Sequence, residues 1–316
     1  MKRQLILGID TSNYTTSLGI VDSDGRIVAN LKRPLPVKPG ECGLRQSDAV
    51  FAHIKNLPDI MSEARSIIGD AEILCIGVSE KPRNEVGSYM PCFLCGVAAA
   101  ESMAAATGAR VYRFSHQCGH VMAAVHSSGA ELDREESFAA FHVSGGTTEL
   151  VRVTPKSSGF LTEIVGSSSD LNAGQAIDRI GVMMGLDFPA GAHIERLALE
   201  NTKKIPMKKP SVTGTVASLS GLQNLAQRLY LETDDKALVS AFTLEYVAGA
   251  LKLMRQGYVD KYGTAKFIFA GGVMSNSIIK ERLACADSYF SEPALSSDNA
   301  VGIALLAARA YFPENK

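Results

Sequence analysis

Residues 5–12 (LILGIDTS), followed by residues 16–21 (TSLGIV), recur in outline as residues 138–146 (FAAFHVSGG) followed by residues 148–153 (TELVRV). Each copy has an apolar run, a turn of small polar or glycine residues, and a second run in which apolar residues alternate with others. That pattern is typical of a β-hairpin. A hairpin unit used twice in one chain predicts a duplicated α/β fold with two lobes.

The remaining elements follow from apolar spacing, since a 3.6-residue period predicts helices and short β-branched runs predict strands. In the first half we expect strands 26–32, 73–78 and 110–112 and helices 49–67 and 92–106. In the second half we expect strands 159–165 and 266–270 and helices 173–184, 236–262, 276–284 and 298–311.

The polar stretch 129–136 separates the two halves. We therefore predict an N-terminal lobe over residues 1–130 and a C-terminal lobe over residues 131–316, with the last helix a candidate to pack back on the first lobe. Clefts between lobes are common ligand sites, so a nucleotide cleft is expected there.

The composition is that of an ordinary globular protein, with 316 residues, 46% hydrophobic, 21% charged and a net charge of −1. This charge excludes a strong overall attraction to nucleic acid or an anionic membrane. No window approaches the roughly 18 apolar residues of a membrane helix, and Asp10 interrupts the first apolar run, so a cytoplasmic protein is expected.

Residues 202–216 form a lysine-rich stretch with two prolines. A solvated surface loop and a contact with a nucleic-acid backbone both explain it, because clustered lysines release counterions from phosphates. The lysines are Lys203, Lys204, Lys208 and Lys209.

Three glycine turns follow apolar strands and are candidate phosphate-binding loops, at residues 8–12, 144–147 and 270–276. Glycine lets backbone N–H groups approach an anion closely. In the first of these turns, Asp10 is a candidate to orient a magnesium-bound water near a phosphate, and a turn or cap residue is the simpler alternative.

His116 and His120 are the sharpest local pattern. On a helix, residues four apart share one face, where two imidazoles can bind one metal ion. Gln117 stands where a zinc protease would have its catalytic glutamate, so that class of enzyme is disfavoured. Asp298 is a third candidate ligand, although as a bare motif it is most simply a helix N-cap.

Together these residues resemble the TsaD family, the bacterial tRNA threonylcarbamoyladenosine synthase subunits once misnamed O-sialoglycoprotein endopeptidases or M22 glycoproteases. The resemblance runs from about residue 5 to residue 308. It rests on the paired histidines and on residues 143–146 (VSGG), 173–178 (AGQAID), 185–191 (GLDFPAG), 220–222 (SGL), 270–273 (AGGV) with Asn276, and 297–299 (SDN).

The resemblance implies an actin-like, Hsp70-like ATPase (ASKHA) fold. It also implies an iron or zinc ion held by His116, His120 and Asp298, in contact with the phosphates of ATP or a carbamoyl-adenylate. Positions matching Asp178, Gly191 and Asn276 would lie beside the sugar and base. The full set of expected nucleotide- or substrate-binding residues is Asp10, Thr11, Val143, Ser144, Gly145, Gly146, Thr147, Asp178, Gly191, Gly271, Gly272 and Asn276.

The family reaction moves a threonylcarbamoyl group from its adenylate to the adenosine next to the tRNA anticodon. Members work with a smaller paralogous (TsaB-like) subunit and a small (TsaE-like) ATPase. We therefore expect a transferase, with tRNA as acceptor and such subunits as partners.

This chain departs from the family pattern at its first turn, where Tyr14 and Thr15 replace an acidic pair, and at Ser47, which replaces a glutamate. Asp10 remains the one candidate for a catalytic carboxylate. Two alternatives therefore stay open: a nucleotide- and metal-binding partner or regulator without transfer activity, and carbamoyl transfer to a small-molecule acceptor.

Overall fold

The computed structural model describes residues 2–36, 44–132, 135–157, 159–296 and 298–312. The chain divides into two compact units. Unit 1 comprises Met1–Glu136, Thr154–Glu163 and Ala294–Lys316, and unit 2 comprises Ser137–Val153 and Ile164–Pro293.

Unit 1 is built on a five-stranded sheet in the order β3-β2-β1-β4-β5. The hairpin strands β1, β2 and β3 are antiparallel, whereas β4 runs parallel to β1 and β5 parallel to β4. The strands are β1 (Gln4–Ser12), β2 (Thr15–Asp22), β3 (Ile27–Pro34), β4 (Glu72–Lys81) and β5 (Arg110–Ser115). The helices are α1 (Gln46–Ile68), α2 (Phe93–Thr107), α3 (His116–Ser128), α9 (Pro293–Ser296) and α10 (Val301–Tyr311).

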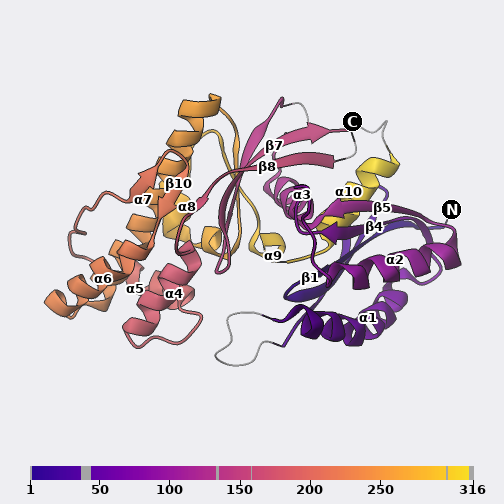
Figure 1. Cartoon of the computed structure of the whole chain (residues 1–316), viewed down its shortest axis with the longest axis horizontal. Helices are drawn as coiled ribbons and strands as arrows, with labels where there is room; N and C mark the ends of the chain where they lie inside the picture. The colour runs from indigo at the N-terminus through magenta and orange to yellow at the C-terminus, as the bar shows by residue number, and fades with distance from the viewer. Residues whose placement is uncertain (1, 37–43, 133–134, 158, 297, 313–316) are drawn as a thin grey trace. The chain divides into compact units, whose positions relative to one another are not determined.

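Helices cover both faces of this sheet (Figure 1). Successive side chains of a strand point to opposite faces, and β1 is apolar on both. Leu5, Leu7 and Ile9 pack with α1 and α2, while Ile6 packs with Val301 and other residues of α10. A strand buried on both faces explains the nearly continuous apolar run of β1.

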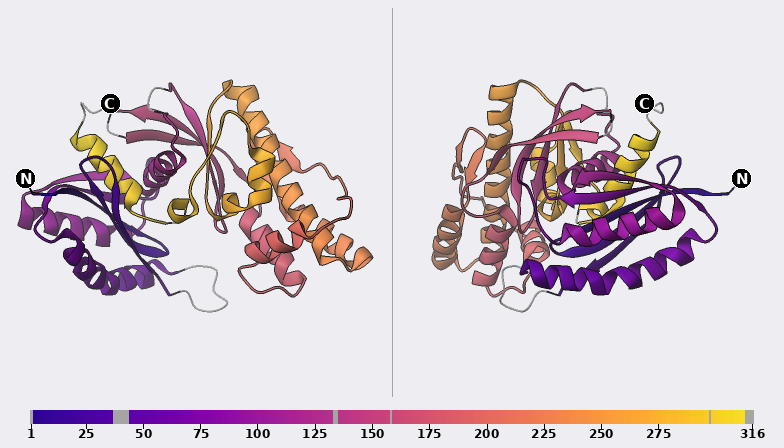
Figure 2. Two further views of the ribbon diagram at one scale, coloured as in Figure 1. Left: turned by 180° about the vertical axis from the view of Figure 1, so that it is seen from behind. Right: turned by 45° about the vertical axis from the view of Figure 1, so that its right-hand side comes forward.

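A row of glycines lets α10 approach the sheet closely. Gly8 of β1 pairs with Gly19 of β2 and with Gly77 of β4, so the three lie side by side across three strands. A Cβ at Gly8 would lie only 2.3 Å from the carbonyl oxygen of Ala300. Figure 2 shows the result, with the C-terminal helix lying beside the first strands of the chain in both views.

Unit 2 is built on a seven-stranded sheet in the order β12-β11-β6-β7-β8-β10-β9, of which the last residues of β7 and the first of β8 are counted with unit 1. Its strands are β6 (Phe138–Val143), β7 (Thr148–Lys156), β8 (Gly159–Ser168), β9 (Ser211–Thr213), β10 (Val216–Ser218), β11 (Phe267–Ala270) and β12 (Ser288–Phe290). Its helices are α4 (Ala173–Met183), α5 (Gly191–Leu199), α6 (Ser220–Thr233), α7 (Lys236–Tyr262) and α8 (Ser277–Leu283), with a 3₁₀ turn, η1 (Gly272–Ser275).

The two sheets share one topology. The order β8-β7-β6-β11-β12 repeats β3-β2-β1-β4-β5, and in both the two added strands run parallel to the first strand of the hairpin. The duplicated hairpin unit predicted from the sequence is therefore confirmed. The lysine-rich stretch 202–216, interpreted as a loop, contains the short strand β9, which pairs with β10.

Helix α7 is the central helix of the unit 2 core. Its length and composition would allow it to cross a membrane, contrary to the expectation that no such window exists. However, 72% of its most apolar window is buried, against side chains that include Phe267 and Phe269 of β11. Its apolar character thus reflects burial in the protein core.

Candidate metal centre and phosphate-binding loops

Helix α3 carries both histidines of the predicted metal centre. The Ser115 hydroxyl accepts a hydrogen bond from the backbone N–H of Cys118 at 3.3 Å, so the helix begins at His116. His120 follows one turn later on the same face. The two Nε2 atoms lie 2.9 Å apart, which confirms the geometry expected from the four-residue spacing.

Asp298 lies between α9 and α10 and points at this pair. Its Oδ1 lies 3.3 Å from Nε2 of His120 and 3.7 Å from Nε2 of His116. Bonds of about 2.0–2.1 Å at tetrahedral angles put ligand atoms roughly 3.3 Å apart. The three separations of 2.9, 3.3 and 3.7 Å bracket that value, so these donors fit one tetrahedral ion such as zinc.

The N-cap interpretation of Asp298 is wrong. Helix α10 begins at Val301, three residues later than the expected start, and Ala300 occupies the cap position. Asn299 is the residue that supports this helix end, because its side chain accepts from the N–H of Val301 and donates to the carbonyl of Leu295. The Asp298 carboxylate is therefore directed toward the histidines, and Ser12 donates to its second oxygen at 3.4 Å.

A glycine contact fixes the distance between α3 and α10. A Cβ added to Gly302 would lie 1.9 Å from the carbonyl oxygen of Gly119, closer than any side chain can approach. Gly119 lies between the two histidines, and Gly302 lies four residues after Asp298. Direct backbone contact thus sets the position of Asp298 relative to the imidazoles.

Asp10 lies in contact with one of these histidines. Its carboxylate is 0% exposed. It lies 3.0 and 3.1 Å from Nδ1 of His116, and Ser79 donates a further hydrogen bond to it. A carboxylate on the distal imidazole nitrogen is the usual support of a metal-ligating histidine.

The local charges favour a cation at this site. Burial acts to lower the pKa of His116, but the charge and hydrogen bond of Asp10, together with the charge of Asp298, outweigh it. They raise that pKa from 6.5 to about 9. The same two carboxylates would stabilise a metal ion bound to the deprotonated imidazole.

Thr11 and His53 hold the neighbouring turn together. The Thr11 hydroxyl donates to the carbonyl of Cys92 and accepts from the N–H of Gly96, so it fastens β1 to α2. The buried His53 contacts Thr16 Oγ1 at 2.8 Å and the Ser12 carbonyl at 2.9 Å. Sequence reasoning missed Ser79, because it lies in no recognisable motif.

The predicted phosphate loops of unit 2 lie at one edge of its sheet. Residues 144–147 follow β6 and residues 271–276 follow β11, and these two strands are parallel neighbours. Both loops therefore leave the carboxyl ends of adjacent strands, where ligands bind in open α/β sheets.

The glycines of these loops fall into two kinds. Gly271 is required by the fold, since its φ is +101° and a Cβ would meet the Val143 carbonyl at 2.2 Å. A Cβ at Gly145, Gly146 or Gly272, in contrast, would meet nothing within 4 Å. All three glycines are exposed, so there is room for an anion beside these loops.

The remaining candidates of unit 2 lie around α4, α5 and α8. Asp178 accepts from the N–H of Ala190 and so holds the turn before Gly191. Asn276 caps α8 by accepting from the N–H of Ile279 at 3.0 Å. Glu195, which the sequence did not single out, accepts from the backbone and hydroxyl of Ser277 and joins α5 to the start of α8.

The expected site residues therefore form two groups. His116, His120, Asp298, Asp10 and Thr11 belong to unit 1. The others belong to unit 2, where they lie in or beside the two loops, within α4, and at the starts of α5 and α8. They are Val143, Ser144, Gly145, Gly146, Thr147, Asp178, Gly191, Gly271, Gly272 and Asn276.

Comparison with known sequences gives one family. Residues 41–305 match TsaD, tRNA N6-adenosine threonylcarbamoyltransferase. A protein of that name from Streptococcus suis is 29% identical over 330 residues, covering 100% of this chain and 95% of the relative. A protein of that name from Thermus thermophilus is 30% identical over 319 residues, covering 98% and 93%.

Comparison with solved structures concerns the fold. Component A of (R)-2-hydroxyglutaryl-CoA dehydratase from Acidaminococcus fermentans matches with a TM-score of 0.55 at 15% identity, over 97% of this chain and 98% of that one. A ROK family glucokinase from Streptomyces griseus matches with a TM-score of 0.52 at 12% identity, over 96% and 99%. The actin-like ATPase fold predicted from the sequence is confirmed.

Proposed function

Because this chain belongs to the TsaD family of tRNA N6-adenosine threonylcarbamoyltransferases, we propose that it transfers a threonylcarbamoyl group to the adenosine next to the tRNA anticodon. The donor in this proposal is the threonylcarbamoyl adenylate. The adenosine amine attacks the carbamoyl carbon, the bond from that carbon to the phosphate oxygen breaks, and AMP leaves with the electron pair. The amine nitrogen releases a proton to solvent.

The observation that carries the proposal is the convergence of two imidazole nitrogens and one carboxylate oxygen within 4.8 Å of one another. Two nitrogen donors and one oxygen donor suit iron or zinc. Because a set of three does not complete the coordination of either ion, a position is left open for a further ligand. Such an ion supplies Lewis-acid stabilisation of negative charge during acyl transfer. His116, His120 and Asp298 would hold it.

The protein residues around the ion have the task of orientation. Asp10 accepts the Nδ1 proton of His116, which keeps the Nε2 lone pair directed at the metal position. Ser79 holds the Asp10 carboxylate in place, and the Gly119–Gly302 contact holds Asp298. Preorganised ligands of this kind avoid a reorganisation cost when the ion binds.

We assign the adenylate, or ATP, to the loops of unit 2. Backbone N–H groups of residues 144–147 and 271–273 would bind phosphate oxygens, because a Cβ would meet open space at three of these glycines. Asp178, Gly191 and Asn276 would lie beside the sugar and base. TsaB-like and TsaE-like subunits belong to the same proposal as assembly partners.

The test is complementation in a bacterium depleted of its own TsaD subunit. Threonylcarbamoyladenosine in bulk tRNA is measured by liquid chromatography and mass spectrometry after expression of this chain. We expect the nucleoside to return with the wild type and with His126→Ala, an exposed histidine on the same helix, but not with His120→Ala. A folded, metal- and ATP-binding wild type that restores none of it would contradict transfer to tRNA.

A further inference from the structure

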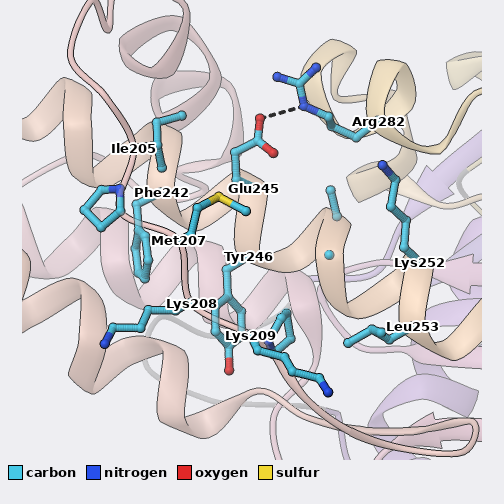
Figure 3. A pocket seen from close by; sticks show the side chains of 14 residues that line it. Ile205, Met207, Lys208, Lys209, Phe242, Glu245, Tyr246, Lys252, Leu253 and Arg282 are labelled. Atoms are coloured by element: carbon cyan, nitrogen blue, oxygen red, sulfur yellow. Dashed lines mark hydrogen bonds and ion pairs between the residues drawn. The ribbon is translucent and has the colours of Figure 1, made fainter.

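Unit 2 contains a pocket of about 520 Å³ that the proposed function does not use (Figure 3). It lies where residues 205–210 cross α7, and Arg282 of α8 closes one side. None of its lining residues belongs to the metal centre or to the phosphate-binding loops. Its volume falls within the range of small-molecule sites.

The inner surface of this pocket is apolar. Phe242 and Tyr246 lie on successive turns of α7 and are only 4% and 6% exposed. Met207 on the crossing segment is 88% exposed, which leaves a large apolar side chain at the mouth of the pocket. Gly249 permits the crossing, since a Cβ there would lie 3.2 Å from the ring of Pro210.

The rim carries positive charge without matching negative charge. Lys208, Lys209 and Lys252 line the pocket, and none of them makes an ion pair within the described ranges of the chain. Arg282 is different, because it pairs with Glu245 at 2.7 Å, as the dashed line in Figure 3 marks. Lys203, just outside the pocket, is likewise paired with Asp235.

We propose that this pocket binds a small anion with an apolar body, such as an aryl or acyl phosphate or carboxylate. The apolar part would pack in the hollow against Met207 and the exposed edges of Phe242 and Tyr246. The anionic group would pair with one of the rim lysines, whose ammonium groups point in different directions in Figure 3. This inference is independent of the transferase proposal, because the two involve different residues.

An RNA strand fits the same features less well. Bases stack on exposed aromatic faces, whereas both rings here are almost fully buried. An RNA backbone would contact the lysines and leave the apolar hollow empty. The inner surface therefore favours a compact ligand with its own apolar part.

The experiment uses methyl NMR of the full chain, observed at Met207 and Ile205, with Met274 of η1 as the reporter for the phosphate-binding loops. Naphthyl phosphate and naphthoate are titrated as the two anionic probes. Inorganic phosphate and naphthol supply the charge alone and the apolar body alone. We expect saturable shifts at Met207 and Ile205 with at least one naphthyl anion, unchanged by ATP, and at least tenfold weaker binding of phosphate and naphthol.

Variants distinguish the contribution of the lysines on the rim from that of the apolar hollow. Lys209→Gln combined with Lys252→Gln should lower the affinity for the naphthyl anion about tenfold, as expected when charged hydrogen-bond donors are lost. Leu253→Trp, which fills the hollow, should abolish binding while the Met274 signal stays unchanged. Lys204→Gln is the matched control, an exposed lysine of the same segment that does not line the pocket, and it should bind like the wild type.

Three results would overturn the proposal. The first is an absence of shifts at Met207 and Ile205 with both naphthyl anions. The second is inorganic phosphate binding as tightly as either of them. The third is a short single-stranded RNA that binds more tightly than either probe and loses affinity in the double lysine variant, which would identify an RNA-contact surface instead.

Discussion

The Asp10 carboxylate, completely buried at the end of β1, lies 3.0 Å from Nδ1 of His116 at the start of α3. This contact fixes which imidazole nitrogen is left to bind a metal. The same carboxylate belongs to the first glycine turn, where the sequence predicted a residue that serves a nucleotide. In unit 1 it is placed to support the candidate metal centre.

Asp10→Asn tests this role directly. The amide keeps the shape but loses the charge, so His116 is held less firmly and is a weaker donor. We expect metal affinity to fall about 10- to 100-fold, measured by competition with a chromophoric chelator. Asp24→Asn, an exposed carboxylate in the turn after β2, should leave the affinity unchanged. Equal affinities for the two variants would rule out the supporting role.

Gly302→Ala tests the contact between α3 and α10. The added methyl group would overlap the Gly119 carbonyl, so the helices must separate and carry Asp298 away from His120. We expect a loss of about 1–3 kcal/mol or more in the free energy of unfolding, together with weaker metal binding. Urea unfolding of metal-free protein measures the first effect.

Gly221→Ala is the matched control for this substitution, because its Cβ would meet nothing within 4 Å in the first turn of α6. An added methyl in a helix should stabilise by up to about 1 kcal/mol. If Gly302→Ala unfolded at the wild-type urea concentration and bound metal normally, the close contact would not position the site.

Gly145→Val tests the unit 2 loops. A Cβ there would meet nothing within 4 Å, so a side chain should not disturb the fold but should block a phosphate. We expect ATP affinity by calorimetry to fall at least about tenfold, the cost of losing one or two charged hydrogen bonds. Ala284→Val, at an exposed position just after α8, is the control. Indistinguishable ATP affinities would move the nucleotide away from this loop.

His53 predicts a pH dependence of stability. Burial lowers its pKa below the usual 6.5, although the hydrogen bond to Ser12 and the charge of Asp10 oppose the shift. The folded pKa thus lies below the unfolded one. The stability gained from neutral His53 is complete above the unfolded pKa and is lost as the pH falls through the folded pKa.

Urea midpoints should therefore drop between about pH 7.5 and about pH 5 in the wild type, and less steeply in His53→Gln. The exposed His126→Gln should keep the wild-type slope. A slope in His53→Gln equal to that of the wild type would assign the acid sensitivity to other groups.

The repeated elements were predicted well from the sequence, because apolar periodicity follows directly from which side chains are buried. Helix α7 begins and ends where predicted, and both hairpins lie at the expected residues. Short elements and elements with few buried residues were not predicted. Helix α5 buries little beyond Ile194 and Ala198, and β9 has three residues, so neither leaves a clear period in the sequence.

The sequence predicted only those site residues that belong to a motif. Spacing along a helix placed His116 and His120 together, and the family resemblance added Asp298. The Asp10–His116–Ser79 arrangement depends on β1, β4 and β5 being parallel neighbours, so that their carboxyl ends meet. That is a property of the sheet order. Glu195 had no sequence signal, because an acidic residue on a helix is usually a solvated one.

The most direct test of the metal centre is elemental analysis of the purified chain. We expect close to one iron or zinc ion per chain in the wild type and in His126→Ala, and almost none in His120→Ala or Asp298→Asn, with all four proteins folded by circular dichroism. A wild type that contains no metal and binds none on titration, yet is as stable and as folded, would contradict the metal centre on which this account rests.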